Sequence, residues 1–195
     1  MRLGFLGGSF DPPHVAHVEM ARLALSSGHV DEVVVVPVFA HAFEKRAWAS
    51  FDDRIALCGL AFAELPQVGV LPIERELASP SYTVQTIRAL LSRRPAERMR
   101  LLVGADVVPE LPRWHEADAL LKLAPPLVFA RVGTPLPTGA IAGLPAVSST
   151  EVRTLLRKVL TDEPEPGDEA RVESLLPLPV LAEIRRRRLY GAEPH

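Results

Sequence analysis

The sequence predicts a doubly wound α/β fold, in which a parallel sheet carries helices on both faces. Short apolar runs alternate with amphipathic runs along most of its 195 residues. This alternation implies parallel strands joined by right-handed helical crossovers. A glycine-rich segment, residues 7–17, follows the first apolar run and leads into an amphipathic one. Because such folds bind ligands where strands end and helices begin, this segment is expected to lie at the binding crevice.

Five short runs are expected to form the strands. Residues 33–36 are consecutive valines, and a continuous β-branched run is typical of a parallel strand that is buried on both faces. Pro37 ends this strand, because proline cannot donate to the ladder. The other expected strands are residues 3–6, 68–73, 100–104 and 127–132, and the expected loops are residues 38–49 and 134–143.

The expected helices lie between these strands and after them. Pro13 suits the first helical position, where no N–H is needed, so the first helix is expected to begin there. Ser50 and Asp53 resemble a capping box at the start of the second helix. Further helices are expected after the turn at residues 79–83, over residues 114–123, over residues 148–160 and around residues 180–184.

Length and composition favour a single domain, residues 1–195, with about residues 1–147 forming the core sheet and residues 148–195 forming C-terminal helices. The net charge of −2 gives no general attraction to nucleic acid or to an anionic membrane. Cys58, the one cysteine, lies in an apolar helical run, so buried packing is expected. With no signal peptide and no apolar run of bilayer length, a cytoplasmic protein is expected, and a homo-oligomer remains open.

The glycine-rich segment has the chemistry of a phosphate site. Gly7 and Gly8 let the backbone approach a ligand without an intervening Cβ. His14 and His17 lie three residues apart, so both face the same side of the first helical turn. The free N–H groups and the dipole at this end attract phosphate. The same dipole disfavours a cation, so both imidazoles are expected to be neutral, each donating one N–H.

Residues 8–17 also carry a specific string, G-x-F-D-P-x-H-x-x-H. At about one chance in twenty for each fixed residue, it would arise by chance on the order of once in 10⁸ positions. The string resembles the first signature of the nucleotidyltransferase superfamily, whose members transfer a nucleotidyl group from a nucleoside triphosphate. Ala16 stands where that family usually has glycine. Alanine is nearly as small and is a better helix former.

A second segment, residues 147–153, reads V-S-S-T-E-V-R. Ser148 and Glu151 fit a capping box, so a well-capped helix would by itself explain the segment. Hydroxyl groups at a helix N-terminus, followed one turn later by Arg153, would also cradle a triphosphate. The segment is similar to the superfamily's second signature, I-S-x-T-x-x-R, with Val147 in place of isoleucine. Two phosphate-binding helix starts in the expected order favour a nucleotidyltransferase.

Further segments resemble one branch, the nicotinate-nucleotide adenylyltransferases. They are R-E-L at residues 75–77, P-S-Y-T at 80–83, G-A-D at 104–106, and the C-terminal L-P at 176–177 and L-Y at 189–190. Together they extend the resemblance over nearly the whole chain. The segment after the second strand, residues 37–45, is closer to the loops of enzymes that use nicotinamide mononucleotide. Nicotinamide mononucleotide therefore stays open as the main acceptor.

The resemblance implies a Rossmann-like fold and adenylyl transfer from ATP to nicotinate mononucleotide, with Mg²⁺ held mainly by the ATP phosphates. It implies catalytic roles for His14, His17, Lys45 and Arg153. The implied ATP contacts are Gly7, Gly8, Ser9, Phe10, Gly104, Asp106, Ser148, Ser149 and Thr150. The implied mononucleotide contacts are Tyr82, Thr83, Thr86 and Trp114. No metal-ligating side chains and no nucleic-acid or membrane partner are implied.

The sequence disfavours three other interpretations. Another adenylyltransferase, for example one acting on phosphopantetheine, is disfavoured by Trp114 and the segment at 80–83. A non-catalytic nucleotide-binding protein on the same fold is disfavoured by His14, His17 and Arg153. The basic run at residues 185–188 is more typical of a solvated helix face than of a nucleic-acid site.

Overall fold

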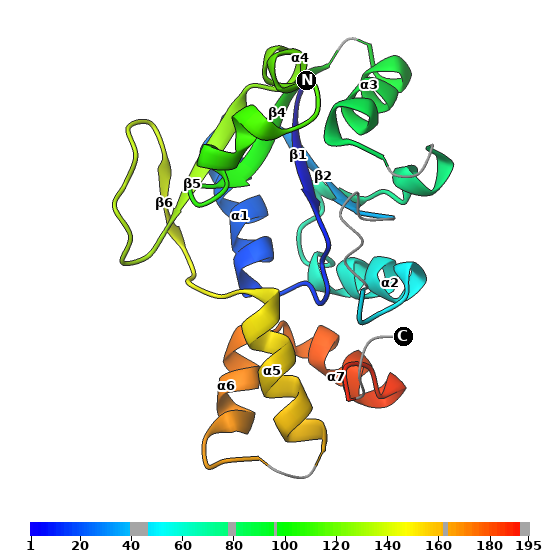
Figure 1. The fold of residues 1–195 in the computed structure, drawn as a ribbon, viewed down its shortest axis with the longest axis vertical. Coiled ribbons are helices and arrows are strands. Elements are labelled where there is room, and N and C mark those ends of the chain that lie inside the picture. Colours follow the sequence, from blue (N-terminus) through cyan, green and yellow to red (C-terminus); the bar gives the residue numbers. More distant parts are fainter. Residues whose placement is uncertain (40–46, 78–80, 96, 162–163, 192–195) are drawn as a thin grey trace.

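A six-stranded parallel sheet forms the centre of the computed structural model, which describes residues 1–39, 47–77, 81–95, 97–161 and 164–191 (Figure 1). The strand order is β3-β2-β1-β4-β5-β6, and every neighbouring pair is parallel. The strands are β1 (Arg2–Gly8), β2 (Glu32–Pro37), β3 (Val68–Val70), β4 (Arg98–Gly104), β5 (Pro126–Arg131) and β6 (Ile141–Leu144). The predicted doubly wound parallel sheet is confirmed.

Helices cover both faces of the sheet. They are α1 (Val15–Ser26), α2 (Phe51–Ala61), α3 (Thr83–Arg93), α4 (Ala117–Leu123), α5 (Ser149–Leu160), α6 (Asp168–Leu175) and α7 (Leu178–Arg187), with 3₁₀ turns η1 (Ile73–Glu76) and η2 (Val108–Arg113). One apolar cluster joins the sheet to α1 and α2 and continues into α5, α6 and α7, and a second joins it to α3 and α4. Figure 1 shows α5–α7 grouped beyond the end of the sheet.

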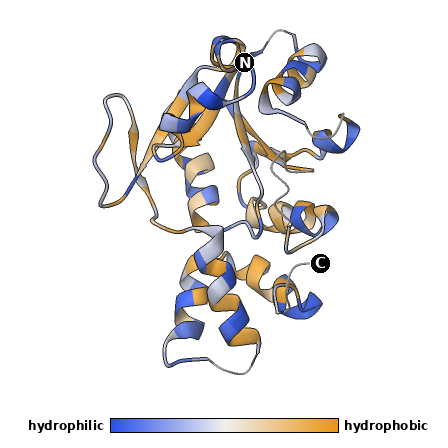
Figure 2. Cartoon of the chain, in the orientation of Figure 1, coloured by the Kyte–Doolittle hydropathy of each residue, from blue (hydrophilic) through white to orange (hydrophobic). Residues whose placement is uncertain are grey.

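Strand β2 shows why a run of valines predicts a central strand. Val33 and Val35 belong to the first cluster, whereas Val34 and Val36 belong to the second. Successive side chains of a strand point to opposite faces, so all four valines are buried. Figure 2 shows the same property as a hydrophobic centre in the sheet. Burial on both faces of β2, as predicted, is confirmed.

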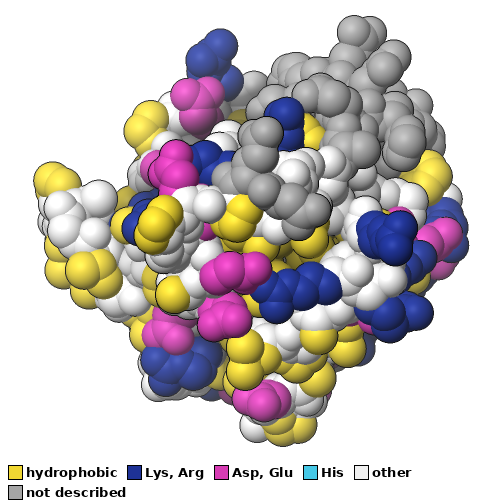
Figure 3. Space-filling view, turned by 90° about the horizontal axis from the view of Figure 1, so that it is seen from below, with side chains coloured by type: hydrophobic (Ala, Val, Ile, Leu, Met, Phe, Trp, Pro, Cys, Tyr) yellow, Lys and Arg dark blue, Asp and Glu magenta, His cyan; other side chains and the backbone are white. Residues whose placement is uncertain are grey.

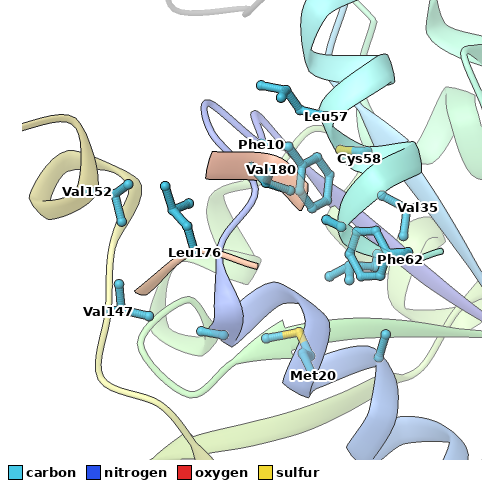
Figure 4. Close-up of a cluster of buried hydrophobic side chains, with 14 of the residues drawn as sticks. Phe10, Met20, Val35, Leu57, Cys58, Phe62, Val147, Val152, Leu176 and Val180 are labelled. Carbon is cyan, nitrogen blue, oxygen red and sulfur yellow. The ribbon is translucent and has the colours of Figure 1, made fainter. Parts of the chain in front are cut away.

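The first cluster anchors the glycine-rich segment to the helices. Figure 4 shows the ring of Phe10 among Leu57 and Cys58 of α2 and Val180 of α7. Phe10 and Cys58 are fully buried. Burial raises the pKa of the Cys58 thiol, which therefore stays protonated and packs as a small apolar group, as expected.

The basic run in α7 is matched by acidic side chains. Arg185 pairs with Glu169, Arg186 with Glu183, and Arg187 with Asp53. The apolar side of α7, which includes Ile184, packs into the first cluster. Figure 3 shows acidic and basic side chains interspersed where the molecule is viewed from this end. Within the described ranges, no helix is both long enough and apolar enough to cross a bilayer.

Strand β6 corrects the prediction of a loop over residues 134–143. The strand is four residues long and pairs with β5 at the edge of the sheet, and Gly143 has a left-handed φ of 107°. Leu144, at its end, is buried. Glycine and proline around the strand obscure it in the sequence, because its main support is the neighbouring β5. The sequence also did not predict α6.

Other boundaries differ from the prediction for local reasons. Strand β3 ends at Val70 instead of residue 73, because Pro72 precedes the 3₁₀ turn η1. Helix α4 begins at Ala117, after the left-handed Glu116, so Trp114 lies at the end of η2 and outside the helix predicted for it. Helix α1 begins at Val15 instead of Pro13, with His14 in extended conformation as the N-cap.

Candidate active site

A pocket of about 570 Å³ opens at the carboxyl ends of β1 and β4. The strand order reverses between these two strands, and α/β sheets of this type bind ligands at that point. Residues from both signature segments and from the end of β4 line the pocket. They include Gly7, Gly8, His14, His17, Gly104, Asp106, Ser148 and Ser149.

The two histidines form a compact pair at the start of α1. Their rings are stacked, with centroids 3.8 Å apart and an interplanar angle of 28°. The backbone N–H of His14 donates to Nδ1 of His17 over 3.1 Å. The ring of Phe10 packs against the His17 ring with centroids 4.8 Å apart. The orientation of His17 is therefore set by its neighbours.

Both histidines are neutral at physiological pH. Burial, with a smaller contribution from the nearby Arg131, lowers the pKa of His14 to about 3. Burial also lowers the pKa of His17 well below its usual value, with smaller contributions from His14 and Arg131. Because Nδ1 of His17 accepts a hydrogen bond, a neutral His17 carries its proton on Nε2. Neutral rings were expected from the helix dipole, but burial is the larger cause.

The two signature segments are hydrogen-bonded to each other, although they lie far apart in the sequence. Oγ of Ser149 donates to the carbonyl of Pro12 over 3.2 Å. Nη1 of Arg153 donates to the carbonyl of Asp11 over 2.6 Å. Oγ of Ser148 accepts from the backbone N–H of Glu151 over 3.2 Å, which caps α5 as predicted. These bonds hold the N-termini of α1 and α5 beside the same pocket.

One family model and several curated proteins match this sequence over most of its length. The cytidylyltransferase-like family model matches residues 5–155. A protein of Anaeromyxobacter dehalogenans strain 2CP-C, described as a probable nicotinate-nucleotide adenylyltransferase, is 39% identical over 191 residues, which cover 96% of each chain. A Myxococcus xanthus protein with the same description is 33% identical over 192 residues, covering 98% of this chain and 95% of that protein.

The chain belongs to the nicotinate-nucleotide adenylyltransferases. It is a nucleotidyltransferase, as the signature segments predicted. The structure of the nicotinic acid mononucleotide adenylyltransferase of Plasmodium falciparum, complexed with NaAD, superposes with a TM-score of 0.79. The two chains are 17% identical and cover 98% of each other, so the fold is shared where most side chains differ.

The ATP-side residues predicted for this adenylyltransferase occupy different positions around the pocket. A Cβ at Gly104 would collide with the Asp106 carboxylate, so a larger residue there would displace that side chain. Phe10 lies behind His17 in the core, and the carbonyl of Ser9 accepts from Arg54. Thr150 is exposed, and its hydroxyl accepts from Arg153 over 3.1 Å. Lys45 lies outside the described residues.

Of the residues predicted to contact the mononucleotide, two line the pocket and two do not. Trp114 and Thr83 line the pocket. The ring of Tyr82 stacks on His115 with centroids 4.2 Å apart. Thr86 is fully buried, and its hydroxyl donates to Oε1 of Glu74 over 3.1 Å. The structure therefore places Thr86 behind the pocket wall, where it orients a carboxylate.

Arg54 is a structural part of the site that the sequence did not predict. Its guanidinium is buried and donates to three backbone carbonyls, those of Ser9, Val38 and Ala49. It thereby ties the glycine-rich segment to both described ends of the segment that follows β2. A single arginine in a helical run carries no sequence signal for this role, because most such arginines are exposed.

Arg131 and Glu74 also line the pocket without having been predicted. Nη1 of Arg131 donates to the carbonyl of Val147 over 2.7 Å, and Nη2 lies 3.4 Å from Oδ2 of Asp106. Glu74 accepts from the backbone N–H of Phe39 over 3.0 Å. Arg131 could have been found from its place at the end of a predicted strand, where these folds place functional side chains.

Proposed function

We propose that this pocket transfers the adenylyl group of ATP to nicotinate mononucleotide, forming the deamido dinucleotide and pyrophosphate. The observation that carries the proposal is the neutral His14–His17 pair beside two joined helix N-termini. Helix N-termini bind phosphate through free N–H groups and the helix dipole. Family membership supplies the two substrates.

The reaction requires no general base. An oxygen of the mononucleotide phosphate attacks the α-phosphorus of ATP in line, and the bond from that phosphorus to the bridging oxygen breaks. The bonding electrons leave with pyrophosphate. Because the attacking phosphate is already an anion, catalysis consists of positioning and charge stabilisation. The absence of a base from the proposed mechanism agrees with histidines whose pKa values are too low for proton transfer near neutral pH.

The histidines serve as hydrogen-bond donors in this mechanism. Nε2–H of His17 is the donor assigned to the α-phosphate, and His14 contacts the phosphates beside it. Arg153, which the carbonyl of Asp11 and the hydroxyl of Thr150 hold in place, neutralises the departing pyrophosphate. Lys45 is proposed to act with Arg153 as a second cation.

Magnesium is proposed to enter with the triphosphate. The pocket contributes mainly N–H and O–H donors, which suit phosphate oxygens, and its Asp106 carboxylate is engaged by Arg131. Across the described ranges, no three His, Cys, Asp or Glu side chains converge as a ligand set. The ion would therefore be held by phosphate oxygens and water. When bound, it supplies positive charge that neutralises the triphosphate.

The nucleoside ends of the two substrates are assigned to the residues near β4. Asp106 is proposed to bind ribose hydroxyls, since its carboxylate lines the pocket. Trp114 is proposed to stack on the pyridine ring, with Thr83 beside it. Tyr82, stacked on His115, supports this end from outside.

The acceptor is tested by comparing kcat/KM for nicotinate mononucleotide and nicotinamide mononucleotide at saturating ATP. We expect the nicotinate form to be preferred, because a carboxylate accepts charge-assisted hydrogen bonds that the amide answers more weakly. A preference for the amide would overturn the assignment. Phosphopantetheine in the same panel tests the other adenylyltransferase. Absence of pyrophosphate release with every acceptor would indicate a nucleotide-binding protein without catalysis.

Lys45→Ala separates phosphate binding from ring selection. As a point charge suited to phosphate, Lys45 should affect both acceptors alike. We expect kcat/KM to fall by a similar factor for the two mononucleotides, leaving their ratio unchanged. A ratio that shifts by about tenfold, equivalent to roughly 1.4 kcal/mol, would show that Lys45 selects the ring.

A further inference from the structure

The Asp11 carboxylate joins three separate segments of the chain. Oδ2 accepts from the backbone N–H of Trp48 over 2.7 Å, and Oδ1 accepts from the backbone N–H of Ala49 over 3.1 Å. Oδ1 also accepts from the hydroxyl of Tyr190 over 2.8 Å, although the two residues lie 179 positions apart. Asp11 and Tyr190 are both buried.

The backbone around Tyr190 is bent to reach this carboxylate. Arg188 and Tyr190 have φ values of 54° and 67°, in the left-handed region that non-glycine residues adopt at a cost. Such conformations persist where the surroundings hold them in place. Burial raises the pKa of Tyr190 well above its usual value, and Asp11 raises it further, so the hydroxyl stays a donor.

Asp11 reaches Arg153 by two routes. Its backbone carbonyl accepts from Nη1 of Arg153 over 2.6 Å. Its carboxylate holds the backbone of Trp48, whose ring lies 5.8 Å from the guanidinium carbons of both Arg153 and Arg157. A guanidinium at this distance from an indole is attracted to the ring. A displacement of Asp11 would therefore change these two contacts of Arg153.

We propose that Tyr190 is a positioning residue for adenylyl transfer, which acts through Asp11 on Trp48 and Arg153. Helix α7 and the turn after it thereby form part of the active-site scaffold. Tyr190 itself is buried and does not line the pocket. The proposal rests on the proposed function insofar as Arg153 faces the departing pyrophosphate.

Tyr190→Phe tests the proposal, because it removes the hydroxyl and keeps the ring. We expect kcat to fall by about tenfold, equivalent to about 1.4 kcal/mol, because the Asp11 carboxylate loses the donor that fixes its position. Because Arg153 acts on the leaving group, KM for each substrate should stay within about twofold of the wild-type value. Ile184→Val is the matched control, since Ile184 is buried in α7 and contacts the core instead of Asp11. It should lower the melting temperature without lowering kcat.

A double-mutant cycle tests whether Tyr190 acts through Asp11. If it does, adding Tyr190→Phe to Asp11→Asn should lower kcat by less than about twofold beyond the single Asp11 variant. If the double variant lowered kcat by the product of the factors measured for the two single variants, the proposal would be overturned. A Tyr190→Phe protein with wild-type kcat would also overturn the proposal, because the hydroxyl would then have no measurable effect on the reaction. A variant that fails to fold would overturn it as well, because the hydroxyl would then contribute only to stability.

Trp48 provides a readout independent of turnover. The sequence has two tryptophans, so Trp114→Phe leaves Trp48 as the only one. In that background we expect Tyr190→Phe to shift the emission of Trp48, and Ile184→Val to leave it unchanged. An unchanged emission in both variants would contradict the proposed route. If the wild-type enzyme released no pyrophosphate, the proposed function would fail, but this measurement would still test the link from Tyr190 to Trp48.

Discussion

The backbone N–H of His14 donates to Nδ1 of His17, and the two imidazoles stack 3.8 Å apart. This bond selects one tautomer of His17, with the proton on Nε2. It also explains why His14 is the N-cap of α1 and not an ordinary helical residue. The backbone thus orients the His17 imidazole before a ligand arrives.

His17→Ala should abolish most turnover and leave the fold intact. Removing one preorganised donor to developing charge costs roughly 3–4 kcal/mol, or about 10²–10³ in kcat. His29→Ala is the control, because His29 is exposed and outside the pocket. Circular dichroism should be unchanged in both variants. A His17→Ala enzyme that keeps more than about a third of wild-type kcat would contradict the proposed role.

The buried histidines should make the folded protein less stable in mild acid. The pKa of His14 is about 3, whereas an unfolded histidine titrates near 6.5. Below that pH the unfolded state takes up protons that the folded state does not, so the free energy of unfolding falls as pH falls. Above it, both states are neutral and these residues contribute no pH dependence.

The size of this effect can be measured by urea unfolding between about pH 7.5 and pH 5. Each histidine whose pKa is lowered by folding changes the free energy of unfolding by at most about 1.4 kcal/mol per pH unit. His14→Asn, in which asparagine remains a good N-cap, should lose about half of the contribution of the pair. If the free energy of unfolding of His14→Asn and of the wild type depended on pH in the same way, the pKa of His14 would not be lowered in the folded protein.

Trp114→Ala should raise KM for the mononucleotide far more than KM for ATP. Trp114 lines the pocket, and stacking on a base contributes about 1–3 kcal/mol. Trp114→Phe should restore much of the affinity, because it keeps an aromatic face. Trp114 also packs against the second apolar cluster, so thermal unfolding is measured alongside the kinetics. Equal increases in both KM values, or an unfolded protein, would indicate a core role instead.

Arg54→Lys should be strongly disruptive although it keeps the charge. A lysine ammonium cannot span the three carbonyls that the guanidinium binds. We expect a loss of about 2–3 kcal/mol in the free energy of unfolding, together with a lower kcat. Arg88→Lys is the matched control, since Arg88 pairs with Glu116 at the exposed surface, where ion pairs add little to stability. If both variants lost the same free energy of unfolding, the three hydrogen bonds of Arg54 would not have the structural role assigned to them.

The parts of the fold that the sequence predicted are those with local causes. The run of valines in β2 is by itself enough to predict a strand that is buried on both faces. Ser50 and Ser148 indicate where helices begin, because each accepts a hydrogen bond from a backbone N–H of the first turn. Strand β6 was missed because its support comes from β5, while Gly143 within it and Gly139 before it suit a loop.

The residues of the candidate site also divide into those with a local sequence pattern, which were predicted, and those without one, which were missed. His14 and His17 were predicted because their spacing within a specific string carries the chemistry. Arg54 and Arg131 were missed because their role depends on carbonyls that the fold brings together from separate segments. Phe10 belongs to the string, yet its ring faces the core, because a string does not distinguish side chains that line a pocket from those that support it.

The burial of Cys58 makes the protein a convenient subject for chemical labelling. The sequence has no other cysteine, and this thiol is inaccessible to a reagent in the folded state. A cysteine introduced at the exposed Leu178, at the start of α7, would then be the single thiol that a maleimide dye modifies. A dye at that position would report directly on how the C-terminal helices respond when nucleotide is added.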